Sequence, residues 1–98
     1  MKKYEVMYIL KPTLEDAARQ ETIDTLHAIL TTDGGVIENV DEWGVRDFAY
    51  EIDGMTKGYY LVVTFNGTTT AVAEFERIAR INSNVIRTMM LSLEDVKK

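Results

Sequence analysis

The order in which two hydrophobic periodicities alternate along the chain constrains its fold more than any other feature of the sequence. Apolar residues recur either at every second position, as in a β-strand, or at helical spacing, as in an amphipathic helix. The expected elements are a strand at 3–10, a helix at 13–32, strands at 36–52 and 59–65, a helix at 70–81 and a strand at 85–93. This order predicts an α+β domain of the split βαβ type (βαββαβ), with a four-stranded antiparallel sheet and both helices on one face.

Capping residues predict where the helices begin and end. Thr13 can cap the first helix, and Asp16, three residues later, has the spacing of a capping box. The run 33–35, Asp-Gly-Gly, can end that helix, because glycine adopts the left-handed conformation that terminates helices. Thr70 or a neighbouring threonine is the expected cap of the second helix.

The strand at 36–52 is expected to be irregular. Its apolar phase slips between Ile37 and Val40, which indicates a β-bulge or bend, and a second irregularity is expected near Gly44. Residues 53–58 contain two glycines and predict a loop before the next strand.

The composition allows one domain, which we expect to span residues 1–93 with a short C-terminal tail at 94–98. Hydrophobic residues make up 46% and charged residues 28%, an ordinary globular balance. The absence of cysteine excludes disulfides, zinc–thiolate sites and thiol nucleophiles, and favours the cytoplasm. The N-terminal apolar run is far shorter than the roughly 18 residues that span a bilayer, so we expect a soluble protein.

Groups able to support catalysis are sparse. His27 is the only histidine, so a catalytic triad or a histidine metal site cannot be assembled. The carboxylates Asp41, Glu42 and Asp47 lie on a strand with no implied polar cleft, which favours a solvated face over an acid–base pair. We therefore expect no enzymatic activity, metal or cofactor.

The predicted sheet has one face that no helix covers. If Tyr4, Val6 and Tyr8 face the helices, side-chain alternation leaves apolar residues on the opposite face. A contiguous exposed apolar patch usually marks a protein partner. The candidate partner-binding residues are Met7, Ile9, Tyr60, Val62, Met89 and Leu91.

The net charge of −5 opposes binding to nucleic acid, so RNA contacts must come from local cations. Many RNA-recognition modules share the predicted fold, but here Leu61 and Thr64 replace aromatic residues on which RNA bases would stack. We attribute the partial match at Lys57-Gly58-Tyr59 to strand composition. The candidate RNA-binding cations are Lys2, Lys3, Arg46, Arg80, Arg87, Lys97 and Lys98.

Four distinctive motifs are spread over the chain: Lys2 to Val6, Trp43 to Ile52, Gly58-Tyr59, and Asn84 to Met89. Together they resemble the bacterial small-subunit ribosomal protein six family over essentially the whole chain. The central motif keeps that family's Gly44, Arg46, Ala49, Tyr50 and Ile52 in register. It departs at Val45, where Lys or Arg is common in the family, and at Phe48, where Leu is usual.

The resemblance implies a ferredoxin-like fold, no enzymatic activity, and a cytoplasmic role in the assembly of the central domain of the small ribosomal subunit. It also implies contact with small-subunit ribosomal RNA and a heterodimer with the small basic ribosomal protein eighteen. An acidic chain fits such an assembly if its basic partner neutralises most of the phosphate charge. The partner would then cover the apolar sheet face.

Two other functions are compatible with the same predicted fold. A small-molecule regulatory domain would bind its ligand at a strand–helix loop, but residues 11–14 lack the glycines that let a ligand approach the backbone. An acyl-phosphate hydrolase would need an arginine and a glycine-rich anion site after the first strand, and the sequence has neither there.

Overall fold

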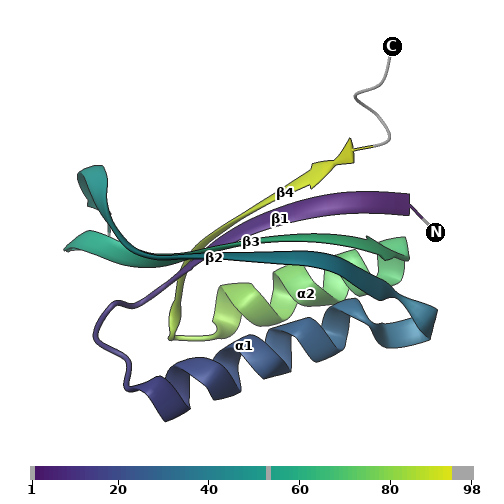
Figure 1. The fold of residues 1–98 in the computed structure, drawn as a ribbon, viewed down its shortest axis with the longest axis horizontal. Coiled ribbons are helices and arrows are strands. Elements are labelled where there is room, and N and C mark those ends of the chain that lie inside the picture. Colours follow the sequence, from purple (N-terminus) through teal and green to yellow (C-terminus); the bar gives the residue numbers. More distant parts are fainter. Residues whose placement is uncertain (1, 53, 94–98) are drawn as a thin grey trace.

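A computed structural model describes residues 2–52 and 54–93 of the chain, so the predicted tail at 94–98, with Lys97 and Lys98, lies outside the described residues. The elements follow the predicted order (Figure 1). They are β1 (Lys2–Leu10), α1 (Asp16–Leu30), the short helix η1 (Thr32–Gly34), β2 (Val36–Ile52), β3 (Met55–Gly67), α2 (Thr69–Ile81) and β4 (Val85–Ser92).

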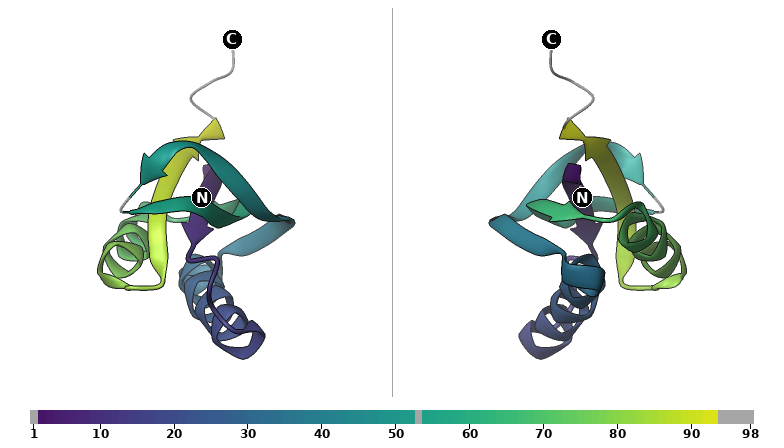
Figure 2. Two further views of the ribbon diagram at one scale, coloured as in Figure 1. Left: turned by 90° about the vertical axis from the view of Figure 1, so that its left-hand side faces the viewer. Right: turned by 90° about the vertical axis from the view of Figure 1, so that its right-hand side faces the viewer.

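The strands form one antiparallel sheet in the order β2-β3-β1-β4. Both helices lie on the same side of this sheet and leave its other face open (Figure 1; Figure 2). This arrangement is the predicted ferredoxin-like split βαβ fold. Among the described residues, no helix combines the length and apolarity that crossing a membrane requires.

The core lies between the sheet and the helices. The even-numbered side chains of β1, from Tyr4 to Leu10, are buried and face the helices, as the period-two pattern predicts. They pack against Leu61, Val63 and Phe65 of β3 and against α1 and α2, through residues such as Leu26, Leu30, Phe75 and Ala79. The odd-numbered side chains of β1 therefore belong to the open face.

The predicted cap of the first helix is wrong. The helix begins at Asp16, with Glu15 as N-cap and no side-chain cap, so Thr13 and Asp16 do not form a capping box. The helix ends at Leu30, two residues before the predicted Thr32. The left-handed φ angles of 60° at Asp33 and 84° at Gly34 lie in the short helix η1 that follows.

The second helix is capped as expected. Thr68, one of the threonines near Thr70, is the N-cap of α2, and its hydroxyl oxygen accepts a hydrogen bond of 3.0 Å from the backbone N–H of Ala71. The helix ends at Asn82, as predicted.

The irregularities predicted in β2 are present. Its register against β3 shifts between Ile37 and Asn39 and again between Glu42 and Gly44. The loop predicted at 53–58 is wrong, because β3 already begins at Met55. The two strands therefore form a long hairpin that extends past β1 and curls toward the open side of the sheet (Figure 1).

A hydrogen bond joins the sheet to α1 within the core. The Tyr8 hydroxyl lies 2.7 Å from Nε2 of His27, and Tyr8 is fully buried. Burial raises the pKa of Tyr8, with smaller contributions from Glu42 and Asp24, so the hydroxyl stays protonated. Burial lowers the pKa of His27, while Asp24 and Glu42 oppose this shift. The folded protein thus favours the neutral form of His27, and the imidazole tautomer determines which of the two groups donates the hydrogen bond.

Acidification should weaken this contact. Because the pKa of His27 is lower in the folded than in the unfolded protein, the unfolded state binds more protons, and stability falls as pH drops below about 6.5. Urea unfolding of wild type and His27→Gln at about pH 7.5 and about pH 5.5 measures the effect, because glutamine can form a hydrogen bond with Tyr8 but does not titrate. The wild type should lose more stability than the variant over this range. Equal losses would show that His27 does not contribute to the pH dependence.

Candidate partner interface on the open sheet face

The register of the strands brings the predicted partner-binding residues together. Met7 lies between Val62 of β3 and Met89 of β4, and Ile9 lies opposite Tyr60. Leu91 lies opposite Glu5 on the same face. The parity predicted from the sequence is therefore confirmed for all three strands.

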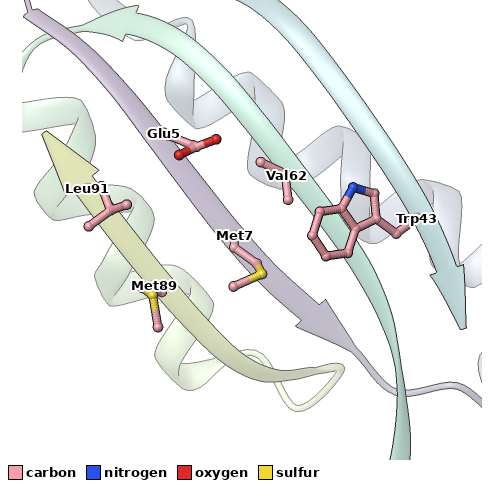
Figure 3. Close-up of a pocket in the computed structure, with 6 residues that line it drawn as sticks. All are labelled: Glu5, Met7, Trp43, Val62, Met89 and Leu91. Atoms are coloured by element: carbon pink, nitrogen blue, oxygen red, sulfur yellow. The ribbon is translucent and has the colours of Figure 1, made fainter. Parts of the chain in front are cut away.

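A shallow groove runs across this face. Figure 3 shows its six lining side chains, which come from all four strands and lie on the side of the sheet away from the helices. They are Glu5, Met7, Trp43, Val62, Met89 and Leu91, and the groove has a volume of about 190 Å³. Met89 and Leu91 are each 49% exposed, which is a large exposed fraction for apolar side chains, because removing such side chains from water is favourable.

An aromatic cluster forms one end of the open face. The rings of Trp43 and Tyr60 are stacked, with centroids 6.0 Å apart and planes at 12°, and Phe48 meets Tyr60 edge-on at 6.1 Å. The guanidinium of Arg46 lies 5.8 Å from the centroid of Trp43. The hairpin of β2 and β3 thus brings aromatic and cationic groups to the groove.

Ile9, an apolar position of the predicted contact set along this face, contributes little to the accessible surface. It is only 6% exposed. A Cβ atom added at Gly58 would collide with Cγ2 of Ile9 and lie 2.7 Å from Cζ of Phe48, so these two side chains meet directly above the glycine. The hairpin therefore encloses Ile9 in a second, smaller apolar cluster.

The predicted RNA-binding cations do not form one cluster. Nζ of Lys3 lies 3.4 Å from Glu38, at the end of the face where β1 begins. Arg87 is exposed opposite Ile9, near the other end, and Arg46 lies opposite Gly58 in the hairpin of β2 and β3. The remaining described cations of this set are Lys2, exposed at the start of β1, and Arg80, exposed in the last turn of α2.

Two groove residues, Trp43 and Glu5, were missed in the sequence-based set of contact residues. Trp43 falls inside the second bulge of β2, where one extra residue makes it impossible to assign a side chain to a face by counting. Glu5 could have been found, because it shares the parity of Met7 and Ile9 on β1.

The carboxylates of β2 do not form an acid–base site. Glu42 accepts a hydrogen bond from the Tyr59 hydroxyl, and this bond raises the pKa of Tyr59. Asp47 lies 3.9 Å from Nζ of Lys57, and both side chains are largely exposed. Within residues 2–52 and 54–93, no three His, Cys, Asp or Glu side chains are grouped as a metal site requires.

Comparisons with known proteins agree with this fold. The family model described as "Ribosomal protein S6" matches residues 3–92 of the chain. The small ribosomal subunit protein bS6 of Halalkalibacterium halodurans is 44% identical over 95 residues, which cover 97% of this chain and 100% of that protein. The crystal structure of 30S ribosomal protein S6 from Thermotoga maritima superimposes with a TM-score of 0.88 at 28% identity, covering 97% of this chain and 90% of that one.

Gly58 should be required for the aromatic end of the face. Gly58→Ala places a methyl group where Ile9 and Phe48 meet, and overpacking of this kind typically costs about 1–3 kcal/mol. That cost exceeds the roughly 0.4–1 kcal/mol expected from lowering the entropy of the unfolded chain. Trp43 is the only tryptophan, so its fluorescence reports both the unfolding midpoint and the local rearrangement. Unchanged emission and stability would mean that the cluster is loosely packed.

Proposed function

Because the chain belongs to the ribosomal protein S6 family, and is thus a structural constituent of the small ribosomal subunit in the bacterial cytoplasm, we propose that it binds ribosomal RNA as half of a protein pair. The partner in this proposal is the small basic ribosomal protein eighteen. The RNA is the central domain of the small-subunit ribosomal RNA, which the pair binds during assembly and retains during translation.

The observation that supports the pairing most strongly is the open apolar face. Met89 and Leu91 leave about half of their surface in water, and Met7 and Val62 continue the patch across the two central strands. Interfaces between proteins have an apolar core surrounded by polar residues, and Glu5 and Arg87 supply polar groups at this patch. A partner that covers the face would remove this apolar area from water.

The charge of the chain supports a basic partner. At a net charge of −5, the isolated protein repels a polyanion, and its described cations are dispersed over the surface. A basic partner would supply the phosphate neutralisation that this chain lacks. Arg46, Arg87, Lys2 and Lys3 would add local contacts at the margins of the joint surface.

The alternative of a small-molecule regulatory domain has less support. The groove volume of about 190 Å³ is below the roughly 300–1,000 Å³ of typical ligand pockets. Ribosomal protein S6 is in general not a family of enzymes, which also disfavours the hydrolase alternative.

Partner binding should depend on the exposed methionine of β4. Met89→Asp places a charge in a surface that the partner desolvates, which should weaken heterodimerisation by about 2 kcal/mol or more, as measured by calorimetry. Ile81→Asp is the matched control, because Ile81 is 68% exposed but lies on α2, on the other side of the sheet. Equal affinities for wild type and Met89→Asp would remove the open face from the proposed interface.

RNA binding should require both proteins. Alone, the chain should bind central-domain RNA poorly at about 0.15 M salt, and adding the partner should increase affinity strongly. Replacing Lys2, Lys3 and Arg87 together by alanine should reduce the salt slope of the pair by about 0.7–0.9 log units for each phosphate that is no longer neutralised. Filter binding across a salt series, with and without partner, measures both effects. Tight binding by the chain alone would contradict the obligatory pair.

A further inference from the structure

The open face carries opposite charges at its two ends. We propose that its acidic end, where Glu5 lines the groove, binds a specific arginine or lysine of the partner and so fixes the direction in which the partner lies on the sheet. This inference rests on the proposed function and adds to it the residue that determines specificity.

Two carboxylates, Glu5 and Glu38, lie at the acidic end, and a third, Asp41, lies in the middle row of the face beside Val62. Glu5 is half-buried in the groove between Thr64 of β3 and Leu91 of β4 (Figure 3). Asp41 of β2 lies opposite Val62, while Glu38 accepts a hydrogen bond from Asn66 and forms an ion pair with Lys3. Lys3 thus already has an acidic partner, whereas no ion pair joins Glu5 or Asp41 to any residue that the structure describes.

Two arginines define the basic end. Arg87 lies opposite Ile9, and Arg46 lies over the Trp43 ring. Glu5 and Ile9 are four positions apart on β1, a separation of about 13 Å at ~3.3 Å per residue. This exceeds the Debye length of about 8 Å at physiological ionic strength, so the two ends act as separate charged regions.

Covering the groove creates a requirement for a cation. Met7, Val62, Met89 and Leu91 surround Glu5 with apolar surface, so any partner that buries them also removes water from the Glu5 carboxylate. A carboxylate that is buried without a partner is strongly unfavourable. An arginine or lysine fits both the apolar groove and the Glu5 carboxylate. Its aliphatic stem can lie on the groove while its charged group reaches Glu5.

The dimensions and charge of the site favour this occupant over a second copy of the chain. A groove of about 190 Å³ accommodates side chains rather than a helix or a metabolite. Two copies at −5 each would repel one another, whereas a basic chain is attracted over a long range.

The test compares two variants with the same change in charge. Glu5→Gln keeps the shape of the side chain and should weaken binding of purified ribosomal protein eighteen roughly tenfold at about 0.15 M salt, with a shallower salt dependence of Kd. Glu21→Gln alters an exposed carboxylate on α1, on the helix side of the sheet, and should change neither quantity. Circular dichroism and urea unfolding should show that both variants fold like wild type.

Charge exchange then identifies the partner residue. Single arginines or lysines of the partner are replaced by glutamate, and the affinity of each partner variant is measured for wild type and for Glu5→Lys. The partner variant that has lost the residue bound by Glu5 should bind Glu5→Lys more tightly than it binds wild type.

The outcomes separate the inference from the function on which it rests. Failure of the wild-type proteins to associate would overturn the proposed pair itself. Association with equal affinity for wild type and Glu5→Gln, or equal losses in Glu5→Gln and Glu21→Gln, would overturn only the role of Glu5. Sedimentation of the chain alone, showing a homodimer that Glu5→Gln dissociates, would assign the groove to a second copy and also overturn the inference.

Discussion

The alternation of side chains along β1 is the constraint on which the rest of the structure depends. This strand lies between β3 and β4, so each of its residues faces either the helices or the open side, and its register assigns the residues of its two neighbours to the same faces. The even-numbered residues form the centre of the core, and Tyr8 adds a hydrogen bond to α1 through His27. If the register of β1 shifted by one residue, its core side chains would turn to the open face and its groove side chains would turn toward the helices.

The sequence was sufficient to predict the features that follow from local periodicity. Element order, strand parity, the threonine cap of α2 and the bulges of β2 all depend on the spacing of residues close together in the chain. The start of α1 was predicted wrongly because contacts over a longer range act there. Arg19 donates a hydrogen bond to the Leu14 carbonyl, pairs with Asp16, and lies 4.4 Å from the centroid of the Tyr59 ring of β3. The contact with Tyr59 joins distant elements, and such a contact leaves no capping pattern in the sequence.

The candidate site shows the same limit. Parity placed Met7, Val62, Met89 and Leu91 on one face, but it could not show that the hairpin covers Ile9, since that depends on how β2 and β3 bend. Residues 53–58 lack an apolar run, yet from Met55 onward they pair with β2. The cations were grouped by closeness in sequence, and the fold separates Arg80 on α2 from Arg87 on β4.

The bulges of β2 also affect whether another copy of this protein can associate along the edge of the sheet. β2 is an outer strand of the sheet, and a regular outer strand offers a row of free N–H and C=O groups to which another chain can add. Repeated shifts of register interrupt the regularity of such a row. The isolated chain exposes an apolar face, and an irregular edge makes the addition of another chain along β2 less favourable. The irregular register thus disfavours association through the outer edge of β2 and leaves the open face of the sheet unchanged.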